Sequence, residues 1–427
     1  MLAATTALVV LTANVNHAQG TETYEQPPIN YSTTPPRDVL AKIQTRLAAG
    51  ELKWTGSGKE IVQSLLRELH IPVESQLLVF SKTSFQRQRI RPEHPRALYF
   101  SDTIYVGWLP SGLVEIAAID PQLGPIFYSF DPNADAPKFV RDNECLSCHG
   151  GTFVRGIPGV FARSVFTDAA GEPLLRFGSE VVDFRTPFTN RWAGWYVTGH
   201  HGTALHRGNV LAQDHGGELV VDLKRGANVA DLSHYFETQS YLAPGSDIVA
   251  LLVFEHQLAM QNTLTRAAQD CRRMLAYQKN LQHDLKEPVT EELSYDSVKR
   301  VFEGAAQDVV NDLLFKDEAH LPEGLAGAAA FPGAFQTGVP RDREGNSLKD
   351  FSLRGHIFRN RCSYLIYSES FLALPAILKR KVYGRLAYAL RPTNPDPKYA
   401  YLGNEERARI NSILQQTHPE FRQAREQ

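Results

Sequence analysis

The sequence predicts an α+β protein in which a β-rich, mostly antiparallel domain is flanked by N-terminal and C-terminal helical segments. Residues 76–240 hold short β-branched and aromatic runs separated by Pro, Gly and Asp, which is typical of antiparallel strands. The segments before and after them repeat apolar residues at helical spacing. With 427 residues, 43% hydrophobic and 22% charged, the chain has a globular composition and can bury a large core.

The N-terminal residues 1–18 are interpreted as a signal peptide. An apolar, small-residue stretch runs from Leu2 to Ala13, and Ala18 is a small residue at a suitable cleavage position. No Lys or Arg precedes the stretch, so the usual basic region is missing, and a short buried helix is the alternative. We expect an exported protein, periplasmic or otherwise outside the cytoplasm, with residues 19–37 as a Pro- and Thr-rich linker.

Residues 38–75 are predicted to form an N-terminal helical segment. Asp38 is a suitable N-cap for VLAKIQTRLAAG, and EIVQSLLRELH follows as a second amphipathic helix. The first predicted strands within residues 76–240 are SQLLVFS, RALYFS, TIYVGWL, LVEIAAI and PIFYSF. Three further runs come after a cysteine motif, namely GVFARSVFT, LLRFGSEVVDF and RWAGWYVTG, with a turn at residues 168–171.

Residues 241–320 are predicted to be helical. Residues 247–282 repeat apolar side chains at helical spacing over about ten turns, and DSVKRVFEGAAQDVVNDLLF forms the second helix. Residues 321–355 are rich in Gly and Pro and are expected to be a connection. Residues 356–427 are again predicted to be helical, with Asn404 capping a last helix.

The overall charge excludes some classes of partner. The formal net charge is −2, which provides no electrostatic attraction to nucleic acid or to an anionic membrane surface. No apolar run reaches the roughly 18 to 20 residues that a bilayer-spanning helix needs. We therefore expect no nucleic-acid partner and no transmembrane span in the mature chain.

The stretch NECLSCHGG, residues 143–151, places Cys145, Cys148 and His149 on one short turn. Two thiols at this spacing can bond the two vinyl groups of a haem, and the adjacent histidine can reach the iron axially. We therefore predict one covalently attached haem c, with thioethers from Cys145 and Cys148 and with His149 as the proximal iron ligand. Such attachment takes place outside the cytoplasm, which agrees with the expected export.

Other uses of this motif stay open as alternatives. A redox dithiol is expected at a strand-to-helix turn of a βαβ fold, whereas the surrounding pattern is antiparallel. A zinc site needs two further ligands, usually a second pair. Cys271 and Cys362 do not form such a pair, and the default expectation is that both are buried free thiols. A structural disulfide within the motif is the remaining alternative.

The sixth iron ligand decides what a haem does, because a strong ligand favours electron transfer and an open site permits catalysis or gas binding. Met260 and Met274 lie in the predicted long helix and are interpreted as core residues. The loop WYVTGHHGTALHRGN gathers three histidines and an arginine, namely His200, His201, His206 and Arg207.

This histidine loop allows three interpretations: a haem ligand or distal group, a separate metal site, or a polar surface loop. Arg207 is a candidate for holding a propionate or polarising a bound oxygen species. His256, beside Glu255 in the apolar stretch ALLVFEHQLAM, is another candidate ligand. A hydrogen-bonded core histidine is the alternative there.

Several stretches resemble a family of bacterial proteins described only as containing a cytochrome c domain. The similar stretches are SQLLVFSKTSFQ, RALYFSDTIYVGW, CLSCHG, RWAGWYVTGHHG, HRGN and IVALLVFEHQ. Where members of that family read T-G-T-H-G and R-H-M-G-N, this chain has His200 in place of Thr and Arg207 in place of Met. The resemblance therefore favours His201 and His206 over His200 and implies a haem, but no particular reaction.

These observations lead to one expected function and two alternatives. We expect an exported monohaem c-type cytochrome that transfers electrons in the periplasm with a redox partner protein. Its fold would be larger and more β-rich than the small all-α cytochrome c fold. The first alternative is a haem enzyme, peroxidase-like or a small-molecule oxidoreductase, with His201, His206 and Arg207 as catalytic candidates. The second is a haem-based redox or gas sensor module.

Overall fold

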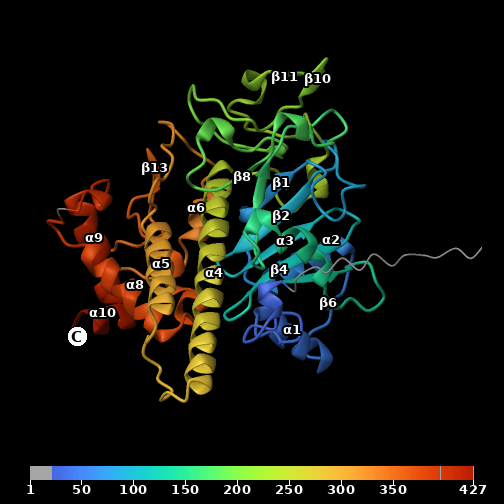
Figure 1. Ribbon diagram of the computed structural model, residues 1–427. Coiled ribbons are helices and arrows are strands. Elements are labelled where there is room, and N and C mark those ends of the chain that lie inside the picture. Colours follow the sequence, from blue (N-terminus) through green and yellow to red (C-terminus); the bar gives the residue numbers. More distant parts are fainter. Residues whose placement is uncertain (1–21, 395, 427) are drawn as a thin grey trace, which may run out of the picture.

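The computed structural model describes residues 22–394 and 396–426 (Figure 1). The signal peptide expected at residues 1–18 lies outside the described residues. The centre of the fold is a seven-stranded antiparallel sheet with the order β6-β5-β4-β3-β2-β1-β9. Its strands are β1 (Leu77–Val79), β2 (Arg96–Ser101), β3 (Ile104–Trp108), β4 (Val114–Asp120), β5 (Gly124–Phe130), β6 (Phe139–Arg141) and β9 (Trp195–Tyr196).

Helices cover both faces of this sheet, which explains why its strands are apolar on both sides. In β4, Ile116 and Ala118 belong to the core beneath α1 (Val39–Ala48) and α2 (Gly58–Glu68). Ala117 and Ile119 alternate with them and join the core on the opposite face. The predicted cap is present, because the Asp38 carboxylate accepts hydrogen bonds from the first turn of α1.

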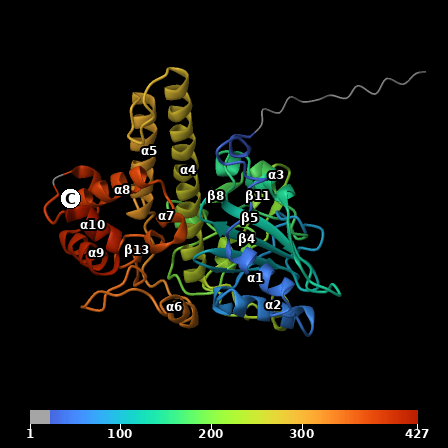
Figure 2. The ribbon, with the colours of Figure 1, turned by 90° about the horizontal axis from the view of Figure 1, so that it is seen from below.

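The helix α4 (Ile248–Asp284) packs on the second face of the sheet and begins after the N-cap Asp247. Three glutamine amides on α4 donate to backbone carbonyls at the turns of the sheet: Gln257 to Ser101, Gln261 to Asp102 and Gln269 to Leu123. The turn before β5 approaches α4 so closely that a Cβ on Gly124 would collide with Thr265. The helix α5 (Asp296–Leu313) packs along α4, and the two helices form a projecting hairpin (Figure 2).

Five further helices pack on α4 or α5, directly or through one another (Figure 1). They are α6 (Ala330–Phe335), α7 (Glu369–Leu372), α8 (Ala376–Ala389), α9 (Asn404–Thr417) and α10 (Pro419–Glu426). A hairpin of β12 (Phe351–Arg354) and β13 (His356–Phe358) precedes α7. Asn404 is the first residue of α9 and Gly403 occupies the cap position, without a side-chain cap.

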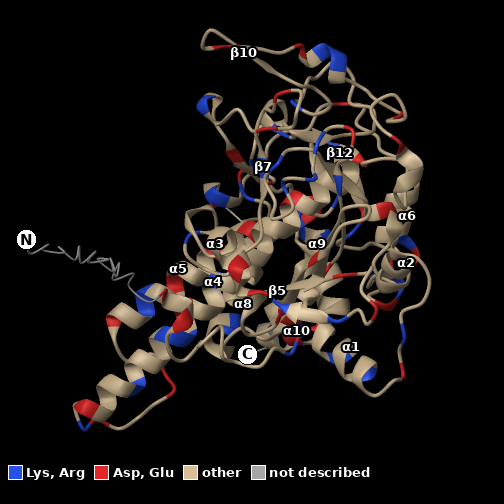
Figure 3. Ribbon diagram, turned by 90° about the vertical axis from the view of Figure 1, so that its right-hand side faces the viewer, with Lys and Arg blue, Asp and Glu red and all other residues tan. Residues whose placement is uncertain are grey.

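The predicted α+β class, with helical segments on both sides of a mostly antiparallel sheet, is confirmed. Smaller elements lie between β6 and α4: α3 (Leu146–His149), the pair β7 (Ala162–Ser164) and β8 (Glu180–Val182), and the pair β10 (Gln213–His215) and β11 (Glu218–Val220). Acidic and basic residues are interspersed along the ribbon (Figure 3). Among the described residues, no helix is long and apolar enough to cross a membrane.

Candidate functional site

The cysteine motif forms a compact turn made of the 3₁₀ segment Asn143–Cys145 and the single-turn helix α3. All cysteines are free thiols, with Cys148 exposed and Cys145 half-buried. Burial, with the nearby charges of Asp142 and Glu115, raises the pKa of Cys145 to about 12. Cys145 is therefore a neutral thiol in the folded chain.

His149 is held in one tautomer. Its Nδ1 lies 2.9 Å from the carbonyl oxygen of Gly159, and a carbonyl can only accept, so Nδ1 carries the proton. The N–H of Gly159 in turn donates to the carbonyl of His149 over 2.8 Å. Burial lowers the pKa of His149, which keeps the ring neutral. Nε2 therefore keeps its lone pair, and no described side chain or backbone group bonds to it.

Aromatic rings fix the plane of this imidazole. The ring centroids of Phe127 and Phe161 lie 4.8 Å and 4.9 Å from that of His149. Phe127 belongs to β5, and Phe161 comes from the loop that follows the cysteine motif. The tautomer and the ring plane are thus both set by the protein, as is usual for a metal-ligating histidine.

The helix α4 anchors the loop between His149 and β7. The Asn262 amide accepts from the Val160 N–H over 2.9 Å and donates to the Val160 carbonyl over 2.7 Å. Gly159 must be glycine here, because a Cβ on it would lie 2.7 Å from Val154 and 2.8 Å from Asn262. The two hydrogen bonds between Asn262 and Val160, the residue after Gly159, hold the Gly159 carbonyl in place against His149.

Two exposed apolar side chains line the same cavity as Phe161, the neighbour of His149. Phe153 is 44% exposed and Val181 is 38% exposed, and Phe153 packs against Phe161 at 5.3 Å. The turn thus offers two free thiols and an available imidazole lone pair, and an exposed aromatic residue follows it in the chain, as a covalently attached macrocycle would require. The residues present therefore fit a haem c held by Cys145, Cys148 and His149.

In the histidine loop, the ring nitrogens that carry lone pairs already accept hydrogen bonds. Nδ1 of His201 donates to the Ala204 carbonyl over 2.8 Å, and its Nε2 accepts from the Asn228 N–H over 2.9 Å. Nδ1 of His206 accepts from the Gly208 N–H over 2.9 Å, so the proton of the neutral ring is on Nε2. Burial and the neighbouring His201 lower the pKa of His206 to about 3. Neither ring offers a free lone pair in this arrangement.

A buried ion pair supports this loop. The Arg191 guanidinium and the Glu255 carboxylate lie 2.6 Å apart and are 0% and 1% exposed. The indole N–H of Trp192 donates to the other Glu255 oxygen over 2.7 Å, and the Trp192 ring packs 5.1 Å from His206. Arg207, a candidate catalytic residue, donates instead to the side-chain oxygen of Asn190 over 2.7 Å. Sequence reasoning singled out Glu255 but missed its partner Arg191.

His256 lies on a different side of α4 from Asn262. Its Nε2 is 2.8 Å from the Ser363 hydroxyl, and its ring stacks on Phe315 at 4.0 Å. Its Nδ1 is enclosed without a partner, and burial lowers its pKa to about 3. Among the described residues, no ring contact joins His149 to His201, His206 or His256, and the sixth ligand stays a prediction.

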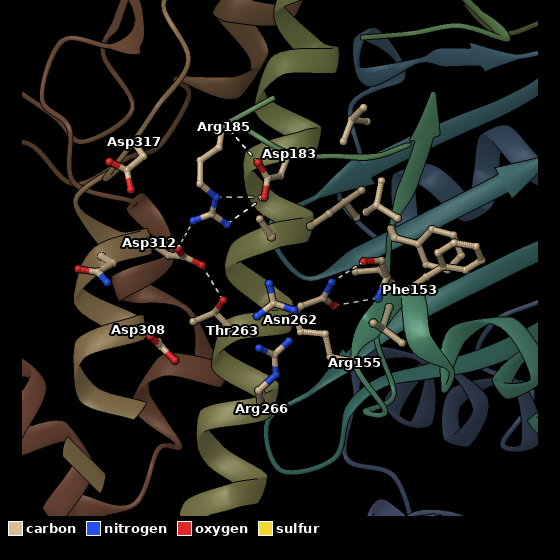
Figure 4. A pocket seen from close by; sticks show the side chains of 18 of the residues that line it. Phe153, Arg155, Asp183, Arg185, Asn262, Thr263, Arg266, Asp308, Asp312 and Asp317 are labelled. Carbon is tan, nitrogen blue, oxygen red and sulfur yellow. Dashed lines mark hydrogen bonds and ion pairs between the residues drawn. The ribbon is translucent and has the colours of Figure 1, made fainter. Parts of the chain in front are cut away.

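A cavity of about 300 Å³ adjoins the cysteine loop (Figure 4). Its walls come from the loop after His149, from β8 and the residues that follow it, and from α4 and α5. This cavity could not be predicted from the sequence, because four separate segments supply its lining. Cys271 and Cys362 are buried thiols elsewhere in the core, as expected.

Comparison of the chain with protein-family models, curated proteins and solved structures found no match. In the described part of the chain, no three His, Cys, Asp or Glu side chains lie together as a group that could hold a metal ion. The geometry of the cysteine turn and of the neighbouring cavity is thus the basis for any functional assignment.

Proposed function

We propose that this chain is an exported c-type haem protein that transfers electrons to or from a redox partner in the periplasm. One haem is bonded through thioethers to Cys145 and Cys148, with His149 as its proximal iron ligand. The observation that carries the proposal is the hydrogen bond from His149 Nδ1 to the Gly159 carbonyl, which leaves Nε2 neutral and unpaired beside two free thiols.

When bound, haem supplies one-electron exchange at its iron. The chain's own groups hold and tune that iron. The Gly159 carbonyl orients the His149 ring and makes the lone pair of Nε2 a stronger ligand for iron. Phe127 and Phe161 keep the ring from turning. The exposure of Cys148 and Phe153 brings this site to the surface, where a redox partner can approach.

The proposal is tested by producing the full chain in a host that matures c-type cytochromes in its periplasm. The purified protein should retain haem through denaturing electrophoresis and gain its mass, and cell fractionation should recover it outside the cytoplasm. The double variant Cys145→Ser/Cys148→Ser should lose the covalent haem, and His149→Ala should change its spectrum. Ser147→Ala, in the same turn, is the matched control and should mature normally. A haem-free wild-type protein with Cys145 bonded to Cys148 would contradict the proposal.

A second candidate function is a haem-dependent oxidoreductase, favoured by the cavity next to Phe161. A surface-exposed electron carrier needs no such cavity, whereas an enzyme needs a place for a substrate. The spin state of the ferric protein distinguishes the two. A low-spin, six-coordinate iron supports electron transfer, and a high-spin iron that binds CO or peroxide rapidly supports the enzyme.

A further inference from the structure

The cavity beside the cysteine loop divides into two electrostatically different sides. On one side Arg185 lies between two carboxylates, 2.9 Å from Asp183 and 2.6 Å from Asp312 (Figure 4). Asp312 also accepts from the Thr263 hydroxyl over 2.6 Å. The charges on this side are therefore paired within the protein.

The other side holds two guanidinium groups that make no direct contact with a carboxylate in the described part of the chain. In the residues that the structure describes, Arg155 and Arg266 form no ion pair and no side-chain hydrogen bond, and the Nε of Arg266 is enclosed without an acceptor. Burial and the positive charge of Arg155 lower the pKa of Arg266, while the nearby carboxylates of Asp270, Asp308 and Asp312 offset part of that effect. Asp308 also lines the cavity and, among the residues with described positions, is in no ion pair. Arg155 is exposed and Arg266 is half-buried. An anion bound between them would accept from their free donors and offset the repulsion between the two cations.

The wall next to these two arginines is apolar. Phe153 and Phe161 line it, and Phe161 also packs against His149. The volume of about 300 Å³ is at the lower end of small-molecule sites, so the cavity suits a small organic acid or one edge of a larger molecule. A planar carboxylate matches the forked donors of arginine.

We propose that this cavity binds a carboxylate group between Arg155 and Arg266, with the apolar body of the ligand against Phe153 and Phe161. Two sources share this chemistry: a free small organic acid, and a propionate of the attached haem. The second source alone rests on the proposed function. In either case the arginine pair is a binding element that acts through charge and bidentate hydrogen bonds.

Benzoate is a suitable probe, because it joins a carboxylate to a planar apolar ring. Calorimetric titration is carried out on the haem-free double variant Cys145→Ser/Cys148→Ser and on the haem-loaded protein. We expect one saturable site on the haem-free protein, with at least tenfold weaker binding of acetate, which lacks the ring. Arg266→Gln and the more exposed Arg155→Gln, each made in the haem-free protein, should both weaken benzoate binding at least tenfold. Arg176→Gln, outside the cavity, should leave it unchanged.

Each outcome decides the inference. Benzoate binding to both forms supports a free acid as the ligand, and binding to the haem-free form alone supports occupation by a propionate. No saturable binding to the haem-free protein overturns the inference, and so does equal binding by the arginine variants. Circular dichroism and thermal midpoints of all variants show whether they are folded. Because the decisive titration uses haem-free protein, its result is independent of whether haem attaches.

Discussion

The cysteine loop, residues 143–161, and the histidine loop, residues 199–209, are both Gly-containing segments with histidine, but their polar groups are used differently. In the histidine loop, both nitrogens of His201 and Nδ1 of His206 bond to backbone groups. In the cysteine loop, His149 bonds through one nitrogen only and both thiols are free. A concentration of histidines thus serves local structure here, while the groups free for chemistry lie in the loop with a single histidine.

The two loops also differ in how they are attached to α4. The histidine loop is supported by the buried charged pair of Arg191 and Glu255, whereas the cysteine loop is held by the neutral amide of Asn262. Removing one member of a buried ion pair costs more than removing a neutral hydrogen bond, because a charge is left without a partner. The comparison therefore predicts a graded set of mutational effects.

The largest effect is expected for Glu255→Ala, which leaves the fully buried Arg191 unpaired. We expect a loss of about 3–5 kcal/mol in the free energy of unfolding, measured by urea denaturation of the haem-free protein. Glu303→Ala is the control, because Glu303 is 45% exposed and pairs with Lys381 and Arg385 near the surface. Its cost should stay below about 1 kcal/mol. Similar losses for the two variants would refute a special role for the buried pair.

The second effect concerns pH. His206 has a folded-state pKa lowered to about 3 by burial, so between pH 6.5 and pH 3 the unfolded chain binds the extra proton. Its contribution to stability is present above pH 6.5 and is lost as the pH falls. In His206→Gln the slope of unfolding free energy against pH should decrease by about 1.4 kcal/mol per pH unit between pH 6 and 4.

Urea denaturation at a series of pH values measures this slope. Glu255, whose pKa burial raises to about 7, makes a contribution of opposite sign that is present in both proteins and cancels in the comparison. The exposed His200, changed to Gln, serves as control and should leave the slope as in the wild type. An unchanged slope in His206→Gln would mean that the ring is accessible to protons when folded.

A smaller effect is expected for Asn262→Ala, which removes both hydrogen bonds to Val160. We expect a loss of about 1–3 kcal/mol and faster amide hydrogen exchange across residues 150–161. Asn311→Ala is a matched change on the facing helix, where the amide accepts only from Gln307 of the same helix. If exchange in the cysteine loop is equally fast in both variants, Asn262 is not its anchor.

The smallest effect on stability is expected for Cys148→Ser, because this side chain is exposed. The haem-free protein should change by no more than about 0.5 kcal/mol. In the wild type, iodoacetamide at pH 8 should label Cys148 at least tenfold faster than Cys145, whose pKa is raised to about 12, with Cys271 labelled only on unfolding. Mass spectrometry of timed samples gives the order. Equal rates for the two motif cysteines would contradict their different burial.

Much of the fold could be predicted because its strongest signals are local. Short runs of β-branched and aromatic residues identified β2 to β5, and Asp38 marked the start of α1. The strand His356–Phe358 was not predicted, because it exists only through its pairing with Phe351–Arg354. Short strands of this kind depend on a partner segment and carry little pattern of their own.

The site was predictable only in part for the same reason. Spacing alone picked out Cys145, Cys148 and His149, since they lie within five residues. The anchor of their loop is 102 residues away, from Val160 to Asn262, and single-sequence reasoning has no access to such a pairing. The bonded state of His201 and His206 likewise depends on Asn228 and on a folded loop. The candidate residues could therefore be predicted, but their hydrogen-bond partners could not.

Because α4 is one continuous helix, the directions in which its side chains point are fixed relative to one another. Glu255 points to Arg191, which precedes the histidine loop, His256 points to Ser363 in the C-terminal layer, and Asn262 points to the cysteine loop. Inserting or deleting one residue between His256 and Asn262 would turn the downstream part by about 100° relative to the upstream part. Every downstream contact would then face the wrong neighbour at once. We therefore expect a change in length to be tolerated better outside this stretch, as in the connection between α4 and α5, residues 285–295, where several side chains are exposed.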